Sequence, residues 1–113
     1  MWHLRRENKY GAKSSNYDGI QYHSKLEAKY ASDLDLLKKA GEIQGWERQV
    51  KISLDVNGYH ITNYYIDFLV HHNNGIKEYI EVKGFETEVW RLKWKLTEAL
   101  LSDQPDIKLT VVK

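Results

Sequence analysis

Apolar residues recur at helical spacing in the first long patterned segment of the chain. Residues 24–43 read SKLEAKYASDLDLLKKAGEI, with apolar positions three or four residues apart, as on one face of a helix. Ser24 is a favourable N-cap, and Gly41 follows two lysines as a helix stop. The pattern therefore predicts a helix whose apolar stripe is Leu26, Tyr30, Leu34 and Leu37.

After this helix the period of the pattern changes to two, which is typical of half-buried strands. Residues 43–56 form one long strand, and Asn57-Gly58 is a strong signal for a hairpin turn. The chain returns in residues 59–72, turns again at Asn73-Asn74-Gly75 and continues in residues 76–84. These segments predict a three-stranded antiparallel meander.

The helical period returns in residues 87–102 and predicts a second helix. Glu86 and Glu88 suit the positive end of its dipole, and Pro105 closes the break that follows. A final β-branched strand is expected over residues 107–112. The predicted apolar stripe of this helix is Val89, Leu92, Leu96 and Ala99 or Leu100. The element order is therefore αβββαβ, an α+β or α/β domain with a mixed sheet and helices packed against it.

Composition places the chain among soluble globular proteins. Its 113 residues are enough for one domain spanning 1–113, and 42% hydrophobic and 29% charged residues are ordinary for this class. The absence of cysteine excludes disulfides and thiolate zinc sites. There is no apolar run of membrane-span length, and the start MWHLRREN lacks a signal-peptide core. We therefore expect a cytoplasmic protein with no membrane partner.

The net charge is only +1, but basic residues gather near the N-terminus. Residues 1–22 combine them with several tyrosines, and YDGIQY at residues 17–22 carries an Asp-Gly signal for a small hairpin. Such an arm is a candidate contact for nucleic acid, although a solvated terminus explains the composition equally well. The basic residues of the arm are Arg5, Arg6, Lys9 and Lys13.

The third predicted strand carries an acid and a base, Glu81 and Lys83, on the same face. On the neighbouring strand Asp67 interrupts the otherwise apolar YYIDFLV. A two-residue turn would point Asp67 and Glu81 to opposite faces, whereas the three-residue turn Asn73-Asn74-Gly75 places them directly opposite each other. Because glycine is the usual last residue of a three-residue turn, we expect the second register.

In this register the two carboxylates repel each other, since the Cβ atoms of directly opposed residues are about 4.5–5.5 Å apart. Lys83 relieves the repulsion in part, and a divalent ion bound by both carboxylates relieves it better. Oxygen-rich sites of this kind suit Mg²⁺. Glu-x-Lys alone is more often a solvated surface pair, so the metal interpretation depends on Asp67.

Glu27 on the first helix is a further acidic candidate. Together with Ser24 it also fits the capping box S/T-x-x-E, in which the glutamate binds its own helix end. Capping alone explains this residue about as well as a functional role does. The two roles are compatible, because a first-turn carboxylate is also able to face the sheet.

The pair His71-His72 invites a histidine–metal interpretation. Adjacent strand residues point to opposite faces, however, and about 13 Å of strand separates His71 from Asp67, which is too far for both to bind one ion. A polar strand end running into a turn is the better explanation of these histidines.

The second helix contains both tryptophans and basic residues. Trp90 and Trp94 are more readily explained as core residues than as stacking platforms. Arg91 and Lys95 are i, i+4 neighbours, and they form either a solvated basic face or a grip on a nucleic-acid backbone. Neither interpretation of this basic pair is favoured by the sequence.

With Glu27, Asp67 and Glu81-Val82-Lys83 in this αβββαβ order, the chain resembles the PD-(D/E)XK nuclease superfamily, which has a restriction-endonuclease-like core. More narrowly, NKYGAKSSNYDGIQYHSKLEAKY, IDFLV and EVKGFETEVWRLKWKL resemble a family of small phage-borne proteins within it. The similarity covers nearly the whole chain. Ile66 stands where the superfamily motif has proline, a common departure.

The resemblance implies that Asp67 and Glu81 bind Mg²⁺ or Mn²⁺ with help from the Val82 carbonyl. Glu27 would be a further acidic ligand, direct or through water. Lys83 would position or deprotonate the attacking water and stabilise the developing phosphorane charge. The products would carry a 5′-phosphate and a 3′-hydroxyl.

Further implied contacts concern the substrate. Gln49, beside Lys51 on the first long strand, is a candidate contact to the substrate or to the metal ligands. The sequence thus predicts a phage-encoded, Mg²⁺- or Mn²⁺-dependent DNA endonuclease in the host cytoplasm. One site cuts one strand, so nicking by a monomer, double-strand cutting by a homodimer and structure-selective cleavage, including junction resolution, all remain open.

Two other classes of function stay open. One is a catalytically inactive module that keeps the nuclease fold and binds DNA or protein. The other is an interaction protein in which Glu81 and Lys83 only solvate a sheet face. The complete set of Asp67, Glu81 and Lys83 favours the enzyme.

Overall fold

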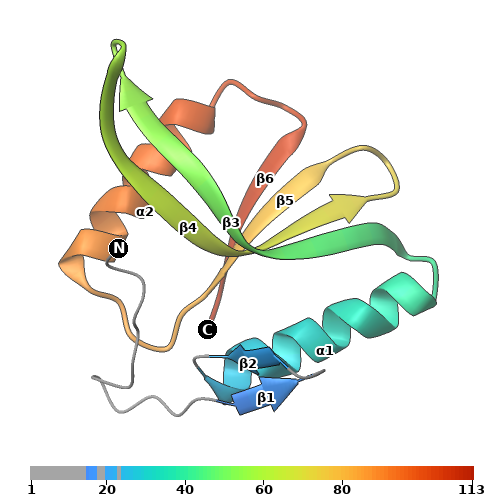
Figure 1. Ribbon diagram of the computed structural model, residues 1–113. Coiled ribbons are helices and arrows are strands. Elements are labelled where there is room, and N and C mark those ends of the chain that lie inside the picture. The colour runs from blue at the N-terminus through green and yellow to red at the C-terminus, as the bar shows by residue number, and fades with distance from the viewer. Residues whose placement is uncertain (1–14, 18–19, 23) are drawn as a thin grey trace.

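The computed structural model of the protein describes residues 15–17, 20–22 and 24–113, and its ribbon is drawn in Figure 1. Its long elements follow the predicted order αβββαβ, which confirms the mixed α+β fold. No helix in this part of the chain is long and apolar enough to cross a membrane. The elements are β1 Ser15–Tyr17, β2 Ile20–Tyr22, α1 Lys25–Lys39, β3 Ile43–Val56, β4 Tyr59–His72, β5 Lys77–Val82, α2 Glu88–Leu101 and β6 Ile107–Val112.

The central sheet has the strand order β3-β4-β5-β6. The first three strands form the predicted antiparallel meander, and β6 pairs in parallel with β5. Parallel neighbours need a long crossover connection, and α2 provides it. The sheet is strongly twisted, so that its strands cross closely at the centre of Figure 1.

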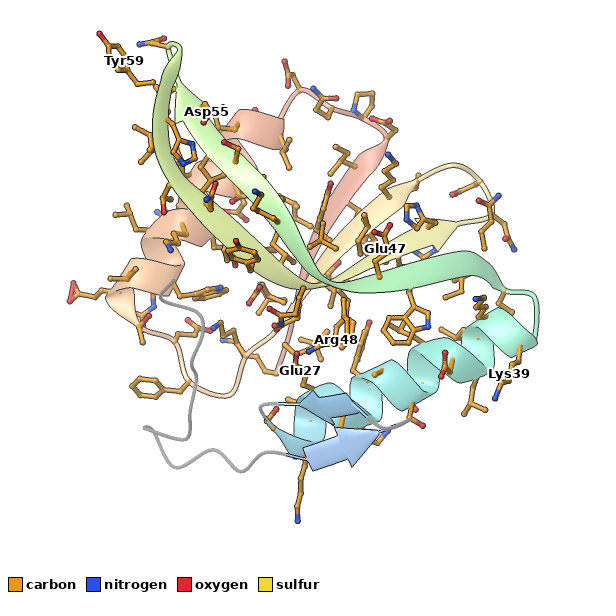
Figure 2. All side chains as sticks on the ribbon, viewed as in Figure 1. Glu27, Lys39, Glu47, Arg48, Asp55 and Tyr59 are labelled. Carbon is orange, nitrogen blue, oxygen red and sulfur yellow. The ribbon has the colours of Figure 1, made fainter. Side chains whose placement is uncertain are left out.

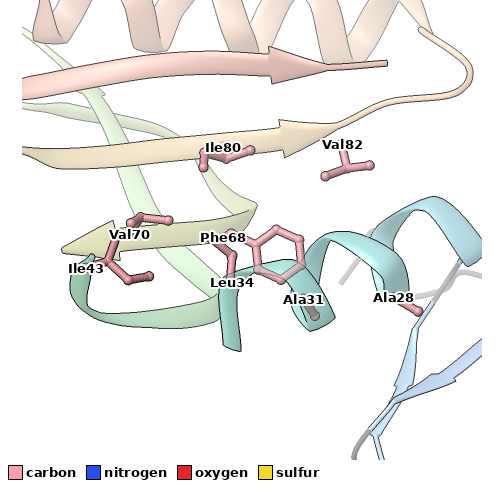
Figure 3. Packing of buried hydrophobic residues seen from close by; sticks show 8 residues of the cluster. All are labelled: Ala28, Ala31, Leu34, Ile43, Phe68, Val70, Ile80 and Val82. Carbon is pink, nitrogen blue, oxygen red and sulfur yellow. The ribbon is translucent and has the colours of Figure 1, made fainter. Parts of the chain in front are cut away.

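The two helices pack against opposite faces of the sheet. Alternate residues of a strand point to opposite faces, and accordingly Ile80 and Val82 of β5 pack with α1, whereas Tyr79 packs with the residues of α2. The apolar core beside α1 is shown in Figure 3 and consists of Ala28, Ala31, Leu34, Ile43, Phe68, Val70, Ile80 and Val82.

The buried face of α1 is only partly the predicted one. Leu34 is buried and Leu26 and Tyr30 pack against the core, but Leu37 is exposed. Ala28 and Ala31 are buried in its place. Their small side chains allow the helix to approach the sheet closely. The ring of Phe68 packs between helix and sheet, in contact with the rings of Tyr30 and Trp46.

The predicted apolar stripe of α2 is correct only at Leu96, which packs against the core beside this helix. Val89 is 60% and Leu92 is 70% exposed, and the helix instead buries Trp90 and Trp94 with Lys93 and Thr97. The two indole rings stack at 5.9 Å. Their large apolar area, together with a hydrogen-bond partner for the Trp90 indole N–H, makes this face the more favourable one to bury.

The N-terminal predictions are tested only in part. β1 and β2 form the hairpin expected in residues 17–22, with Tyr17 opposite Ile20, and the hairpin lies beside α1 (Figure 1). The basic residues of the predicted arm, Arg5, Arg6, Lys9 and Lys13, lie outside the described residues.

The turn between β4 and β5 has the predicted three-residue form. His72 N–H donates to the Ile76 carbonyl at 2.9 Å, which leaves Asn73, Asn74 and Gly75 as the loop. Gly75 has φ 92°, in the left-handed region that glycine adopts without a Cβ clash. This turn fixes the register on which the relation of Asp67 to Glu81 depends.

We expect Gly75→Ala to lower the free energy of unfolding by about 1–2 kcal/mol, because alanine is strained at a positive φ. Gly45→Ala is the matched control: Gly45 lies in β3 without a positive φ, and no atom stands within 4 Å of an added Cβ. Chemical denaturation of both variants measures the difference. Equal stability of the two would contradict a strained turn.

Candidate active site

Asp67 and Glu81 lie at the point where β4 and β5 stop pairing. The last paired residues are Phe68 and Ile80, so the next positions in the same register are Asp67 and Glu81, as predicted. Glu81 Oε1 accepts a hydrogen bond from the Asp67 amide at 3.2 Å, and Asp67 Oδ2 accepts one from the Val82 amide at 2.9 Å. The two carboxylates thus lie side by side and satisfy amides beyond the end of the ladder.

The site holds these carboxylates in a poorly solvated position. Glu81 is only 2% exposed, and burial, followed by the charge of Asp67, raises its pKa well above the usual range. Burial also raises the pKa of Asp67, against the Val82 hydrogen bond and the charges of Lys83 and Arg48. Without a further cation this pair resists carrying two negative charges.

Glu27 reaches the same site from the first turn of α1. Its amide donates to Ser24 Oγ at 3.1 Å, so the Ser24 half of the capping box is present. Its side chain is buried, and a hydrogen bond between the Glu27 and Asp67 carboxyl groups lowers the pKa of Asp67. Glu27 lies near Arg48 between α1 and the sheet in Figure 2. Capping and contact with the acidic pair therefore coexist, as the sequence allowed.

Lys83 follows the end of β5 and stands next to the acidic pair. Its Nζ is 3.8 Å from Glu81 Oε2 and 5.2 Å from the centre of the Trp90 ring. The Trp90 indole N–H donates to the Tyr64 hydroxyl at 2.7 Å, and Tyr64 in turn hydrogen-bonds Glu81, which lowers the Glu81 pKa. Tyr64 and Trp90 therefore connect α2 to both the acid and the amine.

Tyr64, Trp90 and Arg48 were not among the predicted site residues. Strand alternation assigns Tyr64 to the face away from Asp67. However, Tyr64 and Ile66 pack in the core beside α2, whereas Phe68 packs in the core beside α1, so the alternation is interrupted at Asp67. Trp90 was interpreted as a core residue, which it is, but its ring also lies under the Lys83 amine. The sequence carries no local signal for these contacts.

Gln49 contacts Asp67 from β3. Its Nε2 lies 3.5 Å from Asp67 Oδ1, where the ladder between β3 and β4 is interrupted between the pairs Arg48–Phe68 and Val50–Ile66. Gln49 has φ 52°, a left-handed conformation that costs a non-glycine residue about 1–2 kcal/mol. Such strain is retained where the surrounding structure imposes it, often at functional sites.

We expect Gln49→Gly to be more stable than Gln49→Ala by about 1 kcal/mol, because both delete the amide but only glycine relaxes at this φ. The two free energies of unfolding measure the backbone strain directly. A less stable Gln49→Gly variant would show that the strain is absent from the protein in solution.

Of the three basic residues predicted on β3 and α2 as DNA contacts, only Arg91 lies near the candidate active site. Arg91 lines an open pocket that also contains Lys83. Lys51 is exposed opposite Tyr65 on β4, and Lys95 is exposed on α2. Among the described residues, no contact links either of these lysines to the acidic residues of the site. The two histidines are held apart from it, His71 by Glu47 at 2.6 Å and His72 by Glu78 at 2.7 Å.

A family model described as a protein of unknown function, DUF1064, matches residues 7–113. The chain belongs to the DUF1064 family. No curated protein matches it. The match includes Glu27, Asp67, Glu81 and Lys83, so the geometry described above lies wholly within the DUF1064 domain.

The donor set of this DUF1064 domain fits a hard divalent cation. Carboxylate and carbonyl oxygens are the ligands that Mg²⁺ prefers, and it commonly binds through one or two carboxylates while keeping several waters. Glu81 supplies a buried carboxylate and Asp67 a half-buried one, and Val82 adds a backbone carbonyl. In the described part of the chain, no three His, Asp or Glu side chains form a ready-made metal-binding group. A metal here would therefore depend on water ligands as well.

Proposed function

We propose that this protein is a metal-dependent endonuclease that hydrolyses phosphodiester bonds in DNA. The proposal rests on one observation: two adjoining carboxylates, the buried Glu81 and the half-buried Asp67, have a lysine amine 3.8 Å from one of them. Burying two like charges is unfavourable unless a cation compensates them. Two carboxylates that repel each other are suited to bind a divalent ion, and the Lys83 amine beside them is suited to contact an anionic substrate.

Each residue has a distinct role in this proposal. Asp67 and Glu81 would hold Mg²⁺ or Mn²⁺ with the Val82 carbonyl, and Glu27 would support Asp67. The bound metal supplies Lewis-acid activation of water and of the phosphate. Lys83 donates to the oxygens on which negative charge grows during attack, which is favourable because the donor is already positioned.

The surroundings keep Lys83 in this position. The Trp90 ring lies against its amine, and the Glu81 carboxylate holds it from the other side. Because Tyr64 hydrogen-bonds both Trp90 and Glu81, it connects the ring that contacts the amine to the acid. The resemblance of Asp67 and Glu81-Val82-Lys83 to the PD-(D/E)XK motif supports the same reaction.

A second function is a binding module without catalysis, and the hydrogen bonds of the carboxylates favour it. The Asp67 carboxylate accepts a hydrogen bond from the Val82 amide, and the Glu81 carboxylate accepts one from the Asp67 amide. These bonds hold β4 and β5 together beyond their last paired residues, which is a structural role. Titration with Mn²⁺ distinguishes the two functions. Saturable binding that is lost in Asp67→Asn supports the nuclease, and its absence supports the module.

The decisive experiment incubates supercoiled plasmid and branched DNA with the protein in Mg²⁺ or Mn²⁺. We expect cleavage that stops in chelator and is lost in Asp67→Ala and Lys83→Ala. The form of the cut plasmid reports the assembly, since a monomer yields nicked circles and a symmetric dimer yields linear DNA. Activity that survives both substitutions would refute the proposal.

A further inference from the structure

An open pocket adjoins the candidate active site at the start of α2. Lys83 belongs to both, so the pocket begins where the acidic pair ends. It lies over the segment that connects β5 to α2 and reaches the end of β6. Its lining residues are Lys83, Gly84, Phe85, Glu86, Arg91 and Lys113.

Two cations of the pocket converge on one carboxylate. Lys113 Nζ is 2.7 Å from Glu86 Oε2, and Arg91 Nε is 3.3 Å from Glu86 Oε1. Their hydrogen bonds lower the pKa of Glu86, which therefore stays charged. With Lys83, the lining carries three positive groups and one negative group. A phosphodiester presents two oxygens that share a negative charge much as a carboxylate does, so it is able to replace Glu86 as the partner of Arg91 and Lys113.

Phe85 gives the pocket an apolar surface beside these charges. Its side chain is 59% exposed, although the residue lies only three positions after Val82, the buried last residue of β5. Base–aromatic stacking beside a basic groove is the usual way in which proteins bind unpaired nucleotides. In a continuous duplex the base faces are already stacked on their neighbours, so only an unpaired base is able to use this ring.

We infer that this pocket binds an unpaired nucleotide next to the scissile phosphate. Arg91 and Lys113 bind its phosphate, and Phe85 stacks on its base. The inference rests on the proposed nuclease function and narrows its substrate class to branched, frayed or single-stranded DNA. Lys83 then sits between the unpaired nucleotide and the metal ligands.

Fluorescence anisotropy in EDTA separates binding from cleavage. The probes are a labelled single strand, a fork with splayed arms and a blunt duplex of equal length. We expect wild type to prefer the first two, and Phe85→Ala to weaken both at least about fivefold while leaving duplex binding unchanged. Phe85→Trp should retain the preference because it keeps an aromatic face.

Leu92→Ala is the matched control, since Leu92 is also an exposed apolar residue and lies on α2 outside the pocket. We expect it to bind all three probes as wild type does. Arg91→Ala and Lys113→Ala should weaken every probe and each reduce the salt dependence of binding by about one phosphate contact.

The outcomes are separable. If Phe85→Ala weakens the binding of duplex and unpaired probes equally, or weakens the binding of none of them, the pocket is not a site for an unpaired nucleotide. The proposed nuclease function would not be affected by that result. If Phe85→Ala and Leu92→Ala both change the oligomeric state in size-exclusion chromatography, this face binds protein, and the inference falls. If no probe is bound and no DNA is cut, the proposed function fails, and the inference fails with it.

Discussion

Lys83→Met is expected to lower the rate of DNA cleavage at least about a hundredfold, the usual effect of removing one positioned donor from a transition state. Methionine keeps an unbranched apolar stem against Trp90, so the loss reports the amine rather than the packing. The substitution leaves Asp67 and Glu81 in place. Binding of Mn²⁺ should therefore persist, which separates Lys83 from the metal ligands.

Lys95→Met is the control for this experiment, because Lys95 is exposed on α2 and loses the same charge. It should cleave DNA within about twofold of wild type. Rates are measured in single turnover with saturating enzyme, so that weaker DNA binding does not lower them. A Lys83→Met protein that cleaves as fast as Lys95→Met would remove the amine from the reaction.

Glu81→Gln is expected to stabilise the metal-free protein at pH 8 by about 1–3 kcal/mol, since it removes a poorly solvated negative charge next to Asp67. The folded-state pKa of Glu81 is raised, so the native protein binds more protons than the unfolded chain does. Stability contributed by this carboxyl is therefore present at low pH and is lost as the pH rises from roughly 4.3 through the folded pKa.

The pH dependence of the difference between wild type and Glu81→Gln isolates this group, because other shifted carboxyls such as Glu78 occur in both proteins. Exposed Glu98→Gln serves as the control and should show no such difference.

A metal that binds only the folded protein adds about 2.7 kcal/mol at a concentration one hundred times its Kd. We therefore expect Mn²⁺ to stabilise wild type and not Glu81→Gln. A difference that does not grow with pH would contradict a repelling pair.

The relation between Asp67 and Glu81 was predictable because it depends on a local feature. A glycine at the last position of the turn selects a three-residue loop, and strand alternation then carries the register from Gly75 to the acidic pair. The capping serine similarly fixed the first turn of α1 and thus the place of Glu27. Each of these features extends over only a few residues.

The buried face of α2 was not predictable in this way. Its sequence contains two overlapping apolar stripes, one with Val89 and Leu92 and one with Trp90 and Trp94, and helical spacing fits both. The choice between them depends on a partner outside the helix, the Tyr64 hydroxyl on β4. The choice affects the candidate active site, because burial of Trp90 is what brings an aromatic ring against Lys83.

The sequence by itself determined the order of the elements, the turns and the facing acids, because these follow from backbone preferences and from period-two alternation over short distances. Only the tertiary structure decided how Gln49, Tyr64 and Trp90 surround those acids. Their positions depend on the interruption of strand alternation at Asp67 and on contacts between residues 18 and 26 positions apart in the chain. Interactions of that range leave no periodic pattern, since they are fixed by how whole elements pack.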